Sequence, residues 1–259
     1  ISYHETESIN TYQCTQLGSA TVIGGLGIED AIILYDFLNK ARKCLNLDTD
    51  LHVLFLVSVT ANTFEPNWDL YEKKMDELSP SEKSVADTVG IDIRFICKLQ
   101  IDKKGAMKQE LKKKIHPYRM FYYALVLNEI INEKSLDDIA NEFGVQRGNL
   151  QQLQSTTATT ASMISQFCLQ LQWSHLYAIF SAIVDRLNFG VQQELTELVK
   201  IEGVKGSRAR ALFRKGMKTV EDVALSSPDV IFQVLQKLRP FKRKSAESEK
   251  LNYSKYTDR

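Results

Sequence analysis

Residues 148–171 decide the fold of this chain, and they read GNLQQLQSTTATTASMISQFCLQL. Apolar or small side chains recur in this stretch at a near-heptad spacing, at Leu150, Leu153, Thr157, Ala161, Ile164, Cys168 and Leu171. Side chains three, four and seven residues apart share one side of an α-helix. The spacing therefore predicts a long helix that buries this side as a continuous stripe.

The other side of the predicted helix is polar but carries no charge. Small or amide side chains occupy it, at Gly148, Gln152, Ser155, Thr159, Ser162, Gln166 and Gln170. No Asp, Glu, Lys or Arg occurs in the 37 residues from 148 to 184, whereas a solvated helix face normally carries charge. An uncharged polar face suits the sugar and phosphate oxygens of a passing single strand, which must not be held too tightly. Packing against another protein domain explains the missing charge equally well, so both interpretations stay open.

The residues just before this helix have the spacing of a helix-turn-helix motif. Residues 136–145 supply the first helix and the turn, with the small Ala140 inside the helix and Gly144 at the turn. Residues 146–153 begin the second helix, whose side chains suited to base edges are Arg147, Asn149, Gln151 and Gln152. A plain helical corner within a larger bundle has the same spacing, and the two alternatives are equally supported.

Further along the chain, residues 201–212 read IEGVKGSRARAL, the pattern of a helix-hairpin-helix element that grips the DNA backbone. Gly203 and Gly206 are expected to form the tight reversal, because glycine tolerates positive φ. A helix opening at Ser207 would aim unpaired backbone N–H groups and the positive end of its dipole at a phosphate. The predicted phosphate-binding residues are Gly203, Val204, Lys205, Gly206, Ser207, Arg208 and Arg210. An ordinary solvated corner is the alternative, and the DNA interpretation is favoured because every position fits the motif.

Composition limits the kinds of partner. The chain has 259 residues and a formal net charge of +1, so a nucleic-acid surface has to be local. Four cysteines lie far apart without a CxxC or a histidine cluster, which predicts neither a zinc site nor a disulfide framework. No apolar run is long enough to cross a membrane, and a first residue other than Met predicts a fragment of a longer protein. The lysine-rich stretch 103–114 is interpreted as a solvated face or loop rather than a DNA-facing patch.

Helical periodicity and capping residues extend over most of the remaining chain. The expected helices cover residues 28–43, 67–77, 80–89, 91–99, 117–131, 173–187 and 191–199, with two short ones after 219 and 227. Pro117 is expected to open its helix. The apolar run 51–57 predicts either a buried strand or a buried helical turn, and the polar and Gly-rich residues 1–25 are interpreted as the end of a preceding module plus a connection. The predicted fold class is mostly α.

Six segments together carry a family resemblance: QLGSAT at 16–21, DLHVLFLV at 50–57, RGNLQQLQ at 147–154, LNFGVQQEL at 187–195, RARALF at 208–213 and PFK at 240–242. In this order they resemble the C-terminal part of the helicase-like region of DNA polymerase theta. They are similar, more broadly, to the Ski-type superfamily-two DNA helicases such as helicase Q and its archaeal relatives. The resemblance covers most of the chain.

The resemblance implies an architecture of four parts. Residues 1–25 would be the tail of a winged-helix domain, 26–190 a helical-bundle (ratchet) domain, 191–238 a small helix-hairpin-helix domain that closes a DNA channel, and 239–259 a basic and polar tail. The helix at 148–171 would be the ratchet helix, which lies along the translocating single strand.

On this ratchet helix the chain departs from its archaeal relatives. They carry an Arg and a base-stacking Trp where this chain has Gln152 and Thr159. The resemblance therefore implies hydrogen bonding from Gln152, Ser155 and Thr159 in place of aromatic stacking, with Arg147 as the nearest cation.

The sequence lacks the motifs of the family's motor. It contains no Gly-x-x-x-x-Gly-Lys-Ser/Thr phosphate loop, no acidic metal-binding box and no recognisable polymerase carboxylate pair. The chain is therefore expected to bind single-stranded or partially duplex DNA without a cofactor of its own. ATP and Mg²⁺ would belong to the motor domains of its parent, an ATP-dependent helicase or a DNA polymerase. The resemblance implies a nuclear parent that repairs double-strand breaks by end joining. The alternative functions are a sequence-specific helix-turn-helix module and a protein-interaction scaffold.

Overall fold

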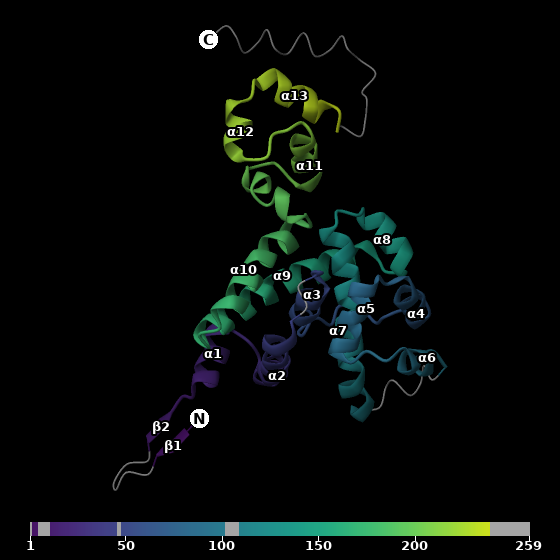
Figure 1. Ribbon diagram of the computed structural model, residues 1–259, viewed down its shortest axis with the longest axis vertical. Coiled ribbons are helices and arrows are strands. Elements are labelled where there is room, and N and C mark those ends of the chain that lie inside the picture. Colours follow the sequence, from purple (N-terminus) through teal and green to yellow (C-terminus); the bar gives the residue numbers. More distant parts are fainter. Residues whose placement is uncertain (1, 5–10, 46–47, 102–108, 239–259) are drawn as a thin grey trace. The chain divides into compact units, whose positions relative to one another are not determined.

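The computed structural model describes residues 2–4, 11–45, 48–101 and 109–238 (Figure 1). By its internal contacts the chain divides into two compact units, which cover residues 1–196 and 197–259. Helices dominate the described residues, so the predicted mostly α fold class is confirmed. The domain boundaries that the family resemblance implies stay predictions. Residues 103–108 of the lysine-rich stretch and the tail after residue 238 lie outside the described residues.

Unit 1 begins with an antiparallel hairpin of two short strands, β1 (Ser2–His4) and β2 (Thr11–Gln13). The described residues after it form α1 (Gln16–Gly24), α2 (Ile28–Cys44), α3 (Leu51–Val57), α4 (Trp68–Glu77), α5 (Pro80–Val89), α6 (Ile93–Ile101), α7 (Gln109–Ile131), α8 (Leu136–Phe143), α9 (Arg147–Gln170), α10 (Ser174–Phe189) and the 3-10 helix η2 (Gln193–Leu195). Most of the expected helices agree with these bounds within two residues.

Helix α9 is the long helix predicted from residues 148–171, and it lies against α1, α3, α7, α8 and α10. Helix α10 runs alongside it, as Figure 1 shows. All seven residues of the predicted stripe are buried. On the polar side, six of the seven residues are exposed and Gln170 is half-buried. The predicted one-sided helix is confirmed, because the 3.6-residue period alone determines which residues share a side.

Helix α1 lies in the stretch that was predicted to end a module and form a connection, so the prediction of a connection is wrong for these residues. Gly24 of this helix permits close packing of α1 against α9. A Cβ added at Gly24 would meet the Met163 carbonyl oxygen of α9 at 3.2 Å and the Phe167 Cβ at 3.3 Å. Thr15 caps the helix by accepting a hydrogen bond from the Gly18 N–H. A glycine needed for close approach and a glycine in a loop produce the same composition, which explains the error.

The ambiguous run 51–57 is the helix α3, and all seven of its residues are buried. Burial on every side removes the periodic pattern that separates helix from strand, so the sequence left the choice open. Helix α3 packs against α7, whose Phe121, Tyr122 and Tyr123 are fully buried.

Helix α7 begins at Gln109 and contains Pro117, so the prediction that Pro117 opens the helix is wrong. Proline removes one backbone N–H from the interior of the helix. Ten of the fourteen residues of α7 after Pro117 are buried, and this packing holds the helix together across the missing hydrogen bond.

A bidentate ion pair joins α10 to the start of α3. The Arg186 guanidinium donates two hydrogen bonds of 2.7 Å to the Asp50 carboxylate, and the Arg186 side chain is only 9% exposed. Paired N–H donors of this kind match the two carboxylate oxygens in distance and direction. Because α10 lies along α9, this ion pair holds the α9–α10 pair against the buried helix α3.

Unit 2 is described from Glu197 to Leu238 and contains the 3-10 helix η3 (Leu198–Lys200), α11 (Gly206–Arg214), α12 (Val220–Leu225) and α13 (Pro228–Gln236). The single helix expected over 191–199 is wrong, since these residues form the separate 3-10 turns η2 and η3. The apolar side chains of these turns are buried. Over so few residues, a 3-10 turn and an α-helix place apolar residues three apart on the same side, so the spacing did not distinguish them. The two short helices after 219 and 227 are confirmed, and Thr219 and Asp222 form a capping box at the first.

The four cysteines are free thiols, and burial raises the pKa of Cys168 to about 12. Within the described residues, no three His, Cys, Asp or Glu side chains are grouped to hold a metal ion. Among these residues no single helix is long and apolar enough to cross a membrane, and α1 and α2 reach that length and composition only as a pair bent by 113°.

Candidate nucleic-acid interface

The residues predicted to grip a phosphate form a tight turn followed by a helix in unit 2. The Val204 N–H donates to the Ile201 carbonyl oxygen over 3.0 Å, and Gly203 is the third residue of this turn with a φ of +78°. Other residues are strained at such an angle, so the predicted positive φ of Gly203 is confirmed. Gly206 instead has helical backbone as the first residue of α11, so its predicted positive φ is wrong. One left-handed residue is enough to reverse the chain here.

Helix α11 begins one residue before the predicted Ser207, with Lys205 as its N-cap. No side chain caps this start, and the first backbone bond runs from the Ala209 N–H to the Lys205 carbonyl oxygen over 2.9 Å. The N–H groups of Gly206, Ser207 and Arg208 come before that bond and have no partner within the helix. Together with the positive end of the helix dipole, these donors favour an anion at this position.

Cations surround the turn and the start of α11. The Arg208 guanidinium donates to the Gly203 carbonyl oxygen, which holds its charge next to the turn. The Arg210 guanidinium carbon lies 5.5 Å from the centroid of the Phe213 ring. Residues 201–220 carry six Lys or Arg and one carboxylate, Glu202 in the turn itself, so the segment keeps an excess of positive charge. Of the predicted residues, the exposed ones are Gly203, Lys205, Ser207 and Arg208, and the half-buried ones are Val204, Gly206 and Arg210.

In unit 1 the predicted residues Gln152, Ser155 and Thr159 are all exposed on the polar side of α9. The Thr159 hydroxyl donates to the Ser155 carbonyl oxygen over 3.1 Å, so in this rotamer it offers only acceptor lone pairs to a ligand. Of these three residues, Gln152 with its amide and Ser155 with its hydroxyl therefore remain as side-chain donors. Gly148, Ser162 and Gln166 are exposed as well, and they extend the uncharged surface along the helix.

Arg147 is the first residue of α9 and is also exposed. Its Nη1 lies 3.3 Å from one carboxylate oxygen of Asp137 on α8 and 3.5 Å from the other. The two side chains are 58% and 73% exposed, and an ion pair this open contributes about 0–1 kcal/mol. A phosphate can therefore displace Asp137 at small cost. The sequence predicted Arg147 but not its partner across the turn.

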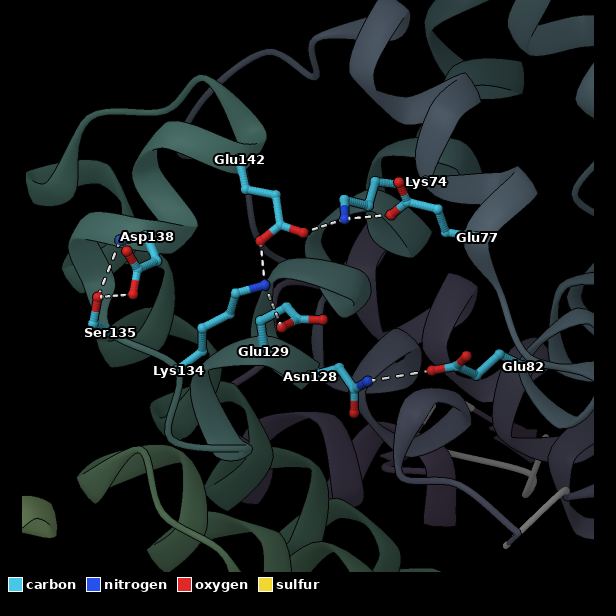
Figure 2. Close-up of polar contacts among 9 residues, drawn as sticks. All are labelled: Lys74, Glu77, Glu82, Asn128, Glu129, Lys134, Ser135, Asp138 and Glu142. Carbon is cyan, nitrogen blue, oxygen red and sulfur yellow. Dashed lines mark hydrogen bonds and ion pairs between the residues drawn. The ribbon is translucent and has the colours of Figure 1, made fainter.

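An ion-pair network that the sequence did not reveal holds α8 in place, as Figure 2 shows. The two oxygens of the Glu142 carboxylate accept hydrogen bonds from Lys74 of α4 and from Lys134 in the α7–α8 connection. Lys134 also lies 3.1 Å from Glu129, and Lys74 lies 2.6 Å from Glu77. Burial by itself would raise the pKa of Glu142, but the hydrogen bonds from Lys134 and Lys74 hold it below its ordinary value. Lys74 and Glu142 are 68 residues apart, so no local spacing could have linked them.

Two more contacts in Figure 2 fix the same region. The Ser135 hydroxyl oxygen accepts from the Asp138 N–H and caps α8, and the Asn128 amide donates to Glu82 of α5 over 3.4 Å. The helix-turn-helix corner exists, with Gly144 at its turn at a φ of +64°, and it is one part of the unit 1 bundle. At the start of its second helix Arg147, Gln151 and Gln152 are exposed, and Asn149 is half-buried.

Comparisons with known proteins agree with this architecture. Residues 29–187 match the family described as the helical domain of the DNA polymerase Q helicase-like region, and residues 193–258 match a domain family of unknown function. The chain is 37% identical over 205 residues to DNA polymerase theta of Caenorhabditis elegans, which covers 78% of this chain and 12% of that protein. It is 34% identical over 235 residues to DNA polymerase theta of Drosophila melanogaster, which covers 90% of this chain and 11% of that protein.

A human protein named Helicase POLQ-like is 28% identical over 239 residues, which cover 90% of this chain and 21% of the human protein. The chain thus spans only 12% and 11% of the length of the two polymerase theta relatives, and about a fifth of this helicase.

Proposed function

The chain belongs to the family of the DNA polymerase theta helicase-like region, and we propose that it is a non-catalytic part of such a DNA-repair helicase or polymerase that guides single-stranded DNA. Separate motor domains of the parent would bind ATP and Mg²⁺ and drive the movement. We propose a nuclear parent that acts in double-strand-break repair by end joining. Loss of end-joined products after deletion of the parent gene is the expected result, and unchanged products would contradict that role.

The observation that carries the proposal is the start of α11. Three backbone N–H groups without partners in the helix follow a glycine turn, and the exposed side chains of Lys205 and Arg208 flank them. Backbone and side-chain donors of this kind bind phosphate oxygens, which are identical at every nucleotide. This arrangement supports DNA binding that does not depend on sequence.

The polar side of α9 supports a second contact of a different kind. Its amide and hydroxyl groups can form hydrogen bonds with sugar and phosphate oxygens, and the absence of charge keeps each bond weak. Weak bonds that repeat along a helix allow a strand to exchange one partner for the next as it moves. Arg147 at the first turn adds one cation, which Asp137 releases at small cost.

The proposal is tested by the double variant Lys205→Glu, Arg208→Glu, with a fluorescent single-stranded oligonucleotide and anisotropy as the readout. We expect affinity to fall at least about tenfold near physiological salt. The slope of log affinity against log salt concentration should become less steep by about 0.7 for each phosphate that the variant no longer neutralises. The matched control is Lys83→Glu, Arg94→Glu, which reverses the same two residue types at exposed positions of α5 and α6. Equal affinity in both double variants would remove the hairpin from the proposed function.

The same assay separates the alternative functions. A sequence-specific reader at the α8–α9 corner would bind one duplex far more tightly than random duplexes, and selection from a random duplex pool would enrich that sequence. A protein-interaction scaffold would show no binding to any nucleic acid even at low salt. Tight, salt-dependent binding of single strands without enrichment would contradict both alternatives.

A further inference from the structure

A cavity of about 850 Å³ opens in unit 1 between the end of α2 and the start of α10. Leu45, Leu176 and Ile179 contribute to an apolar wall, and Arg42, Trp173 and His175 add aromatic and cationic groups. Its volume lies within the roughly 300–1,000 Å³ of small-molecule sites. None of the residues assigned above to the α9 surface or to the hairpin lines it.

Two different groups pack against the Trp173 indole. The Arg42 guanidinium carbon lies over the indole ring, 4.6 Å from its centroid, and Arg42 lines the cavity. The Tyr35 ring stacks on the indole at 5.5 Å with an angle of 28° between the planes, and Tyr35 is not a lining residue. Tyr35 therefore supports the indole from outside the cavity, and the Arg42 guanidinium covers it inside.

The backbone that presents this indole is the turn that ends α9. Gln172 has a φ of +61°, in the left-handed region that residues other than glycine rarely adopt. It stands between the end of α9 and Trp173, which is the N-cap of α10, and the Trp173 N–H donates to the Cys168 carbonyl oxygen over 2.9 Å. With the Gln172 N–H donating to the Leu169 carbonyl oxygen over 3.0 Å, these bonds form the left-handed cap that commonly ends an α-helix. This cap fixes the position of the indole at the edge of the cavity.

The chemistry of the lining matches one class of ligand. Among the described residues that line the cavity, Arg42 is the one permanent cation and no carboxylate is present, so an anion is favoured there. The apolar wall and the indole favour a flat, largely apolar group. A nucleotide has both parts, since its base stacks on aromatic rings and guanidinium planes and its phosphate pairs with arginine. Because Trp173 provides no side-chain cap to α10, the backbone N–H groups at the start of that helix add further donors.

We propose that this cavity binds one nucleotide unit, with its base against Trp173 and its phosphate at Arg42. The Arg42 guanidinium leaves the indole face as the base arrives and pairs with the phosphate. The unit is either one residue of a DNA strand or a free mononucleotide, because both present the same base and phosphate. The site uses no residue of the hairpin: as a strand site it rests on and deepens the proposed function, and as a free-nucleotide site it goes beyond that function.

The experiment uses Trp173 itself as the reporter. The chain has two tryptophans, and Trp68→Phe in the full chain leaves Trp173 as the only one. Titration with oligothymidylate and, separately, with thymidine 5′-monophosphate is expected to quench the Trp173 emission to a plateau with at least one of them. Quenching by the oligonucleotide alone assigns the site to a strand, and equal quenching per nucleotide by both assigns it to a free nucleotide.

Two further variants in the same background make the assignment specific. Arg42→Gln is expected to raise the probe concentration at half-maximal quenching about tenfold, because it removes the charge that pairs with the phosphate. Lys43→Gln removes the same charge from the adjacent exposed residue, which does not line the cavity, and is expected to leave the curve unchanged. Circular dichroism of both variants checks that they are folded.

Three results would overturn the inference: no change of Trp173 emission with either probe, identical curves for Arg42→Gln and Lys43→Gln, or a fluorescence change that persists when Trp173→Phe is made in the chain that retains Trp68. Anisotropy of a labelled oligonucleotide in the same samples separates this inference from the proposed function. Binding without quenching overturns the nucleotide site and leaves the hairpin in place. Quenching that persists in the Lys205→Glu, Arg208→Glu variant supports the nucleotide site even where the hairpin proposal fails.

Discussion

Replacing Glu142 by Gln is expected to destabilise unit 1 by about 2 kcal/mol at neutral pH. The Glu142 carboxylate pairs with Lys74 and Lys134, and the three side chains are 25%, 17% and 35% exposed. A fully exposed ion pair contributes about 0–1 kcal/mol, whereas breaking a buried one costs about 3–5 kcal/mol. Partial exposure places each of the two ion pairs near 1 kcal/mol. Glutamine keeps the size of the side chain, so the variant reports the loss of charge.

The assay is urea unfolding followed by circular dichroism, with thermal unfolding as a second measurement. A loss of about 2 kcal/mol lowers the melting temperature of a unit this size by roughly 4–8 °C. The control Glu77→Gln removes a carboxylate from the same Lys74, but Glu77 is 63% exposed, and its loss should cost no more than about 0.5 kcal/mol.

The effect of pH gives this prediction its sharpest test. The pKa of Glu142 is held below its ordinary value in the fold, so its contribution to stability is present above that ordinary value and is lost as the pH falls through the folded pKa. The stabilities of the parent chain and of Glu142→Gln should therefore converge as the pH falls below the folded pKa of Glu142. Equal stability of the two at neutral pH, or a difference that is undiminished in acid, would refute the reasoning.

Three other outcomes follow from local geometry. Thr159→Glu on the exposed side of α9 should weaken single-strand binding in the anisotropy assay, and Thr159→Lys should strengthen it. The melting temperature should be unchanged in both variants. Equal affinities of the two variants would contradict a role for this surface. Gly203→Ala should lower the free energy of unfolding of unit 2, measured in urea, by about 1 kcal/mol because Gly203 has a φ of +78°. Gly206→Ala lies at a helical position and should cause no such loss. Equal losses would refute the assignment of the turn. Burial raises the pKa of Cys168 to about 12, so at mildly alkaline pH a thiol reagent should label the exposed cysteines and reach Cys168 only after unfolding, as mass spectrometry would show. Rapid native labelling of Cys168 would contradict its burial.

Two errors in the prediction from sequence share one cause. Gly24 reads as a loop residue, yet it permits the close approach of α1 to α9. Pro117 reads as a helix start, yet buried side chains after it keep α7 continuous. In both cases a packing partner far along the chain outweighed the local preference of the residue.

The candidate site, like the fold, could be predicted from the sequence only in part. The exposed side of α9 and the turn at Gly203 followed from spacing and from glycine chemistry. Asp137 beside Arg147, the pair Lys74–Glu142 and the cavity at Trp173 did not, because each is made by residues from different helices.

The sequence by itself determined the features that depend on neighbours within a turn or two of helix: the buried and polar sides of α9, the glycine reversal before α11 and the local excess of cations around it. These features need no knowledge of the rest of the fold, because helical period and backbone freedom are properties of the residues concerned. Only the tertiary structure decided that residues 51–57 are a helix, and that Arg186 pairs with Asp50 across 136 residues. Burial and charge pairing depend on which distant segments meet, and the chain reveals this only when it is folded.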